Sequence, residues 1–170
     1  TISGGEPTVQ QEFLAALLKS CKSEGISTAI ETNGTADRKI YEELIRYTDL
    51  FLIDFKMSDP AKHEKYTGKR NDGIYTILSV LQEAKRDVIL RCPVIPGIND
   101  DSEHLKKLRQ IKEEFQCIRE VEIMPFHNAG MQKWDKIGRD YEFRSKKAMD
   151  QKEKLKIERF IRSKSEWKNY

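Results

Sequence analysis

Two periods of apolar residues alternate along this chain, one typical of helices and the other of buried strands. Residues 10–24 place apolar side chains three and four positions apart, which predicts an amphipathic helix that Gly25 ends as a C-cap would. Residues 50–55 form an almost unbroken apolar run, as expected of a parallel strand buried on both faces. Asp59 and Pro60 then match a helix N-cap followed by proline at the first helical position.

The remaining pattern continues this alternation of strand and helix. It predicts further strands at 1–3, 27–30, 88–94 and 120–124, and helices at 37–47, 60–67, 73–85, 102–115 and 144–163. Regular alternation specifies a parallel sheet with helices on its outer face. We therefore expect an α/β fold with five strands, in one domain covering residues 1–170.

Composition excludes several classes of partner. The 31 Lys and Arg against 28 Asp and Glu give a formal charge of +3, which does not indicate a nucleic-acid binder. No apolar run approaches the ~20 residues that span a bilayer, and no secretory signal is visible. The late basic residues predict a solvated helix face, with an interaction tail as the alternative: Arg144, Lys146, Lys147, Lys152, Lys154, Lys156, Arg159, Arg162, Lys164 and Lys168.

The three cysteines, Cys21, Cys92 and Cys117, are far apart and odd in number, which argues against a disulfide framework. A reducing, cytoplasmic setting fits them best. No two have the CxxC spacing of a metal site, and each lies in an apolar stretch. We therefore expect buried free thiols without a ligand role.

Polar or glycine-proline chemistry follows every predicted strand. In parallel sheets the functional residues gather at the carboxyl ends of the strands, so these segments are expected on one rim. They are Ser3-Gly4-Gly5-Glu6-Pro7, Glu31-Thr32-Asn33-Gly34, Asp54-Phe55-Lys56, Arg91-Cys92-Pro93 with Pro96-Gly97, and Pro125-Phe126-His127-Asn128.

The first of these segments has two readings. Gly4 and Gly5 let a ligand approach bare backbone, and Glu6 adds a carboxylate beside the exposed carbonyls, an acceptor cluster suited to an ammonium group. The alternative is an ordinary strand-to-helix turn.

Lys56 suits a carboxylate ligand, and Asp54, two residues earlier, points the same way. A self-contained salt bridge is the alternative for this pair. Glu31, Thr32 and Asp54 form a candidate site of oxygen ligands for a cation. The alternative is a helix N-cap and turn at residues 32–34, which is compatible with the cation site.

Arg91 lies inside its strand, where ligand contact competes with an ion pair to Asp54 or Glu31. His127 follows a strand exit and is a candidate ligand contact, whereas His63 and His104 are predicted to be surface residues on helices. The segment 128–134 is predicted to be a loop crossing the mouth of the site, or else a simple connector.

The order of these segments resembles the radical S-adenosylmethionine superfamily: GGE, ETNG, DFK, PVIPGIND and MPFHNAGMQKW. Within it, the chain is similar to activating enzymes of glycyl radical enzymes, most of all those acting on pyruvate formate-lyase, from residue 1 to about residue 141. The resemblance implies a partial (β/α)6 barrel, here with its first βα unit missing. It also implies a 5′-deoxyadenosyl radical that removes hydrogen from a glycine of a pyruvate formate-lyase-like partner.

By this resemblance, Gly4, Gly5 and Glu6 take the amino group of S-adenosylmethionine, Asp54 and Lys56 lie against its carboxylate and ribose, and His127 contacts the adenosine. The expected cofactor-binding residues are Gly4, Gly5, Glu6, Thr32, Asn33, Asp54, Phe55, Lys56, Arg91 and His127. The candidate site for a monovalent cation comprises Glu31, Thr32 and Asp54. No catalytic residue is assigned to this chain.

The chain departs from the family in one motif, because the CxxxCxxC loop that holds a four-iron four-sulfur cluster is absent. We expect an N-terminally truncated piece, inactive alone, of a parent enzyme served by a flavodoxin- or ferredoxin-type reductant. Two alternatives remain open: a radical S-adenosylmethionine enzyme with a small-molecule substrate, and a non-catalytic nucleotide-binding βα module. The segment 128–134 is the expected docking surface for the partner's glycine loop.

Overall fold

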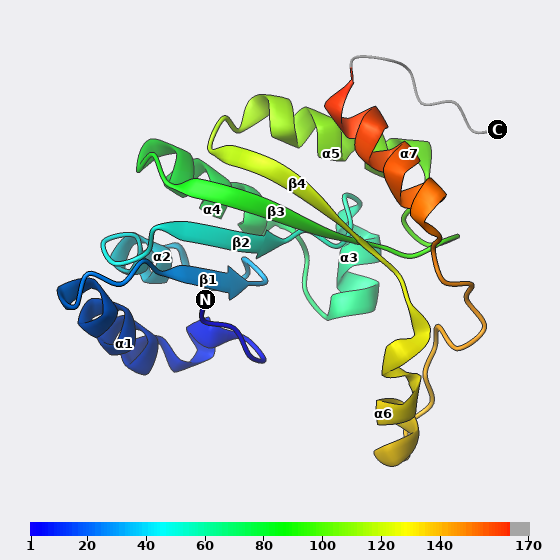
Figure 1. The fold of residues 1–170 in the computed structure, drawn as a ribbon, viewed down its shortest axis with the longest axis horizontal. Helices are drawn as coiled ribbons and strands as arrows, with labels where there is room; N and C mark the ends of the chain where they lie inside the picture. The colour runs from blue at the N-terminus through cyan, green and yellow to red at the C-terminus, as the bar shows by residue number, and fades with distance from the viewer. Residues whose placement is uncertain (164–170) are drawn as a thin grey trace.

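A parallel four-stranded sheet forms the centre of the computed structural model, which describes residues 1–163. Its strands pair in sequence order, as Figure 1 shows: β1 (Ala29–Thr32), β2 (Leu50–Asp54), β3 (Asp87–Val94) and β4 (Ile118–Pro125). The predicted parallel α/β fold is confirmed. The expected strand at 1–3 is reduced to one parallel bridge between Ile2 and Ile30, because the chain turns away at Gly4.

Helices connect the strands, so each βα unit returns the chain to the same end of the sheet. Before the last strand lie η1 (Pro7–Gln10), α1 (Gln11–Ser23), α2 (Arg38–Leu44), α3 (Pro60–Thr67), α4 (Asp72–Glu83) and α5 (Ser102–Glu114). Three more helices follow β4: η2 (Asn128–Gly130), α6 (Met131–Lys136) and α7 (Gln151–Arg162). As predicted, Asp59 caps α3, Pro60 opens it and Gly68 ends it in the left-handed conformation, with φ 79°.

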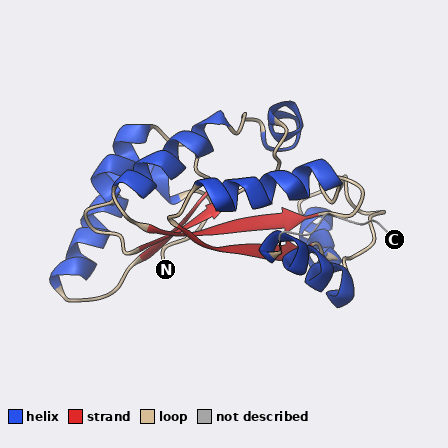
Figure 2. Ribbon diagram, turned by 90° about the horizontal axis from the view of Figure 1, so that it is seen from above, coloured by secondary structure: helices blue, strands red, loops and turns tan. Residues whose placement is uncertain are grey.

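The two faces of the sheet differ in burial. Side chains alternate along each strand, and those on one face, such as Phe51, Ile53 and Leu90, are fully buried. Most helices lie along that side of the sheet (Figure 2). The opposite face, which carries Asp54 and Arg91, is only partly covered. The structure therefore leaves one face of the sheet accessible next to the carboxyl ends of the strands.

Two predictions for the last third of the chain were wrong. The segment 128–134 is not a loop: it forms η2 and the start of α6, and His127 Nδ1 accepts the Ala129 N–H at 3.3 Å. The last helix begins at residue 151 rather than 144, because Asp150 and Glu153 form a reciprocal capping box there.

The predicted solvated helix face is confirmed for Lys152, Arg159 and Arg162, which are exposed on α7. It was wrong for Arg144, Lys146 and Lys147, which precede the helix, and Lys164 and Lys168 lie outside the described residues. None of the helices described within residues 1–163 is both long and apolar enough to cross a membrane.

Candidate cofactor site at the carboxyl ends of the strands

The backbone at Gly4 and Gly5 is open to its surroundings. Both residues are exposed, and a Cβ built on either one would meet no atom within 4 Å. Gly4 has a φ of 146°, a conformation that other residues rarely adopt, whereas Gly5 is free of that restriction. A ligand can therefore approach the main chain directly at the end of the first strand segment.

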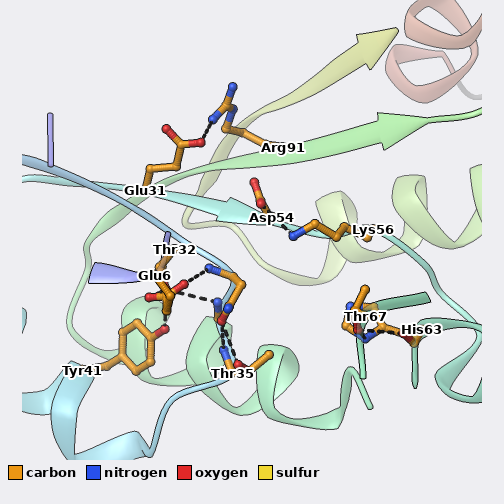
Figure 3. A network of polar contacts seen from close by, with 12 residues as sticks. Glu6, Glu31, Thr32, Thr35, Tyr41, Asp54, Lys56, His63, Thr67 and Arg91 are labelled. Carbon is orange, nitrogen blue, oxygen red and sulfur yellow. Dashed lines mark hydrogen bonds and ion pairs between the residues drawn. The ribbon is translucent and has the colours of Figure 1, made fainter. Parts of the chain in front are cut away.

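Glu6 ties this segment to β1, as Figure 3 shows. Its Oε1 accepts the hydroxyls of Thr8 at 2.7 Å and Thr32 at 2.8 Å, and its Oε2 accepts the Asn33 N–H at 2.8 Å. Thr32 donates its only proton to Glu6, so the Tyr41 hydroxyl, 2.8 Å away, donates to Thr32. Both carboxylate oxygens are thus engaged within the protein, and Glu6 cross-links the rim.

Several ion pairs lie on the accessible face of the sheet. Lys56 Nζ lies 2.9 Å from Asp54 Oδ2, which forms the salt bridge considered as an alternative for this pair. Arg91 pairs with Glu31, as Figure 3 shows, rather than with Asp54. It also pairs with Glu122, at 3.1 Å. The Arg91 side chain is only 16% exposed, so the two carboxylates balance a largely buried charge.

The structure does not bring the candidate cation ligands together. Thr32 is buried on the helix-covered face, whereas Glu31 and Asp54 point to the accessible face, because side chains alternate along a strand. Among residues 1–163, no three His, Cys, Asp or Glu side chains gather closely enough to hold a metal ion.

Two other predicted site residues differ in accessibility. The Phe55 side chain is fully buried and stacks on His104, with ring centroids 6.2 Å apart, so only its main chain is left for a ligand. His127 is exposed at the exit of β4.

Three buried polar side chains hold the loop that carries Lys56, and sequence reasoning missed them. Asn99 Nδ2 donates to the Lys56 carbonyl at 2.8 Å, and Asn71 Nδ2 donates to the Met57 carbonyl at 2.9 Å. His104 Nδ1 accepts the Ser58 N–H at 3.1 Å. Each of the three is 3% exposed or less. They fix the main chain of residues 56–58 from three distant parts of the sequence.

The predictions that His63 and His104 lie at the surface were wrong. Both are 3% exposed. Burial lowers the pKa of His104 to about 4, so its ring is neutral at pH 7 and presents a lone pair to the loop. A histidine on a polar helix gives no signal of this role, because its partner, Ser58, lies 46 residues away along the chain.

The cysteines do not form a cluster site. All three thiols are free, with Cys92 fully buried and Cys21 and Cys117 partly exposed, so burial was predicted correctly only for Cys92. Burial raises the pKa of the Cys92 and Cys117 thiols, which disfavours the thiolate that a cluster needs. The residues present therefore do not fit an iron–sulfur cluster.

Comparison of the sequence and the fold with known proteins identifies the family of this chain. Residues 1–108 match a family model described as the Radical SAM superfamily. A crystal structure of a domain of pyruvate-formate lyase-activating enzyme from Bacteroides vulgatus has the same fold, with a TM-score of 0.75 at 24% identity over 95% of this chain and 91% of that chain. This chain belongs to the radical S-adenosylmethionine superfamily.

The relatives of this chain include activating enzymes of glycyl radical enzymes. The pyruvate formate-lyase-activating enzyme of Clostridium pasteurianum is 36% identical over 162 residues, which cover 95% of this chain and 68% of that protein. The trans-4-hydroxy-L-proline dehydratase activating enzyme of Clostridioides difficile is 41% identical over 145 residues, 84% of this chain and 48% of that protein. The chain thus spans 68% of the length of the first of these relatives and 48% of the second.

Proposed function

We propose that this chain forms the S-adenosylmethionine-binding core of an enzyme that installs a glycyl radical on a pyruvate formate-lyase-like partner. The observation that carries the proposal is the open backbone of Gly4 and Gly5 on the same rim as Lys56. Similarity to the Clostridium pasteurianum activating enzyme over 95% of the chain supports the reaction class.

In this proposal three groups at the rim each hold one part of the cofactor. The exposed carbonyls beside Gly4 and Gly5 accept the ammonium group, Lys56 donates to the carboxylate, and His127 contacts the adenosine. Reduced by one electron when bound, S-adenosylmethionine supplies the radical that takes hydrogen from the partner's glycine. Glu6 orients the first strand end through its bonds to Thr32 and Asn33.

The proposal has five further parts. The superfamily implies a four-iron four-sulfur cluster, whose thiolates the residues of this chain do not supply. A flavodoxin- or ferredoxin-type protein delivers the electron, and the cytoplasm suits the free thiols. Residues 1–170 act as one domain around a continuous apolar core, and the segment 128–134 faces the partner.

Electron paramagnetic resonance tests the function. We expect the full-length enzyme, given S-adenosylmethionine and a reductant anaerobically, to generate a glycyl radical on pyruvate formate-lyase from Clostridium pasteurianum. Omitting S-adenosylmethionine should abolish the signal. Cleavage of S-adenosylmethionine without any radical on the partner would contradict the proposed substrate.

Gly5→Ala separates cofactor binding from folding. The added Cβ meets no protein atom within 4 Å and the backbone is unstrained there, so the variant should unfold at the same denaturant concentration as the natural protein. It should bind S-adenosylmethionine at least about tenfold more weakly, because the methyl group blocks close approach to the main chain and leaves polar groups imperfectly paired. Calorimetric titration measures this, and undiminished affinity would place the cofactor elsewhere.

A further inference from the structure

A cavity of about 520 Å³ opens at the same rim, between η1, the loop after β1, and α3. Glu6, Asn33 and Lys56 form the wall it shares with the proposed cofactor site, and His63, Tyr66 and Lys69 line its far side. We propose that the far side binds the main chain of the partner's glycine-bearing peptide and that His63 Nε2 accepts a peptide N–H there. This inference rests on the proposed function.

The ring of His63 is prepared for this contact. Its Nδ1 lies 2.6 Å from the Lys69 carbonyl, an obligate acceptor, so Nδ1 carries the proton and Nε2 is an acceptor. The residue is 3% exposed and lines the cavity. Within the described residues Nε2 has no hydrogen-bond partner, yet it is not among the polar atoms sealed from the surface. His63 thus offers an unpaired, accessible acceptor on a side chain that lines the cavity.

The remaining lining matches a peptide better than a purely apolar or purely ionic ligand. Lys69 Nζ is an unpaired donor in the part of the chain that the structure describes, and Thr8, Thr35 and Thr67 offer hydroxyl lone pairs. Val9 and the Tyr66 ring add apolar surface. A peptide presents N–H and C=O groups in turn, so donors and acceptors are both satisfied.

A row of aromatic contacts leads from the cavity wall toward the segment expected to face the partner. Tyr66 contacts Phe143 with ring centroids 5.8 Å apart, Phe143 contacts Tyr141 at 5.8 Å, and Tyr141 stacks on Trp134 of α6 at 5.6 Å. This aromatic row joins α3 to α6. A single extended peptide can thus contact both elements, and aromatic side chains are common at protein interfaces.

Two substitutions at His63 isolate the Nε2 atom in the full-length enzyme. His63→Asn keeps a donor near the Lys69 carbonyl and removes the acceptor at Nε2, whereas His63→Gln keeps an amide group at the Nε2 position. The probe is a synthetic peptide spanning the radical-bearing glycine of pyruvate formate-lyase from Clostridium pasteurianum. With S-adenosylmethionine bound, His63→Asn should weaken peptide binding about 3- to 10-fold by calorimetry, as loss of one hydrogen bond predicts, and His63→Gln should restore part of it.

Glu64→Gln, an exposed change on the same helix that does not line the cavity, should leave peptide binding unchanged. S-adenosylmethionine affinity should be the same in all three variants. Equal loss of both affinities in His63→Asn would assign the cavity to the cofactor, and undiminished peptide binding would also overturn the inference. Failure of the unsubstituted enzyme to form a glycyl radical would instead refute the proposed function, so the two failures are distinguishable.

Discussion

Replacing Lys56 by alanine in the full-length enzyme should weaken S-adenosylmethionine binding about ten- to a hundredfold. A hydrogen bond to a charged group contributes roughly 1.5 to 3 kcal/mol, and each 1.4 kcal/mol changes affinity about tenfold. Lys56 Nζ is held by Asp54 at 2.9 Å, and its main chain is held by Asn99, so the ammonium group is already oriented before the ligand arrives. Calorimetric titration measures the change.

Lys65→Ala provides the control, because Lys65 is an exposed residue of the neighbouring α3 that lies outside the rim cavity. The Lys65→Ala variant should bind S-adenosylmethionine as tightly as the natural protein does. Asp54→Asn should both weaken binding and lower stability, since it leaves Lys56, whose side chain is 37% exposed, without its counter-charge. Unchanged affinity of Lys56→Ala would show that the lysine serves only the salt bridge.

The free energy of unfolding should fall by about 2 to 3 kcal/mol between pH 7.5 and pH 4.5 through His104 alone. Burial lowers its pKa in the folded chain from 6.5 to about 4. Between these values the unfolded chain binds a proton that the folded chain refuses, so this stability is present above pH 6.5 and is lost as the pH falls; a shift of that size corresponds to about 3 kcal/mol in full.

His104→Asn isolates this effect. Asparagine keeps an acceptor near the position of Nδ1 for the Ser58 N–H but does not titrate. Urea denaturation at several pH values should give a flatter pH dependence for the variant, although its stability at pH 7.5 is lower because the stacking on Phe55 is lost. The charges of Asp101 and Lys62 also affect the pKa of His104. The two proteins are therefore compared by the slopes of their stability against pH. Parallel curves for both proteins would exclude a neutral, buried His104.

Local sequence patterns correctly predicted those helices and strands that are specified by their own residues. The apolar run at 50–55 and the cap at Asp59-Pro60 gave a buried strand and a helix start that the structure confirms. The start of the last helix was predicted seven residues too early, because residues 144–150 are mostly polar and basic, like the exposed surface of a helix. Only the capping box at Asp150 shows where α7 begins.

The sequence by itself determined the parallel α/β order and the set of strand ends that form the rim. Hydrophobic period and turn residues are short-range properties, and parallel pairing brings the carboxyl ends of the strands to one edge. The tertiary structure alone decided the partners: Arg91 with Glu31 and Glu122, Glu6 with Thr32, and His104 with Ser58. Each of these pairs joins residues 26 to 60 positions apart, and their meeting depends on strand register and helix packing, which no local pattern encodes.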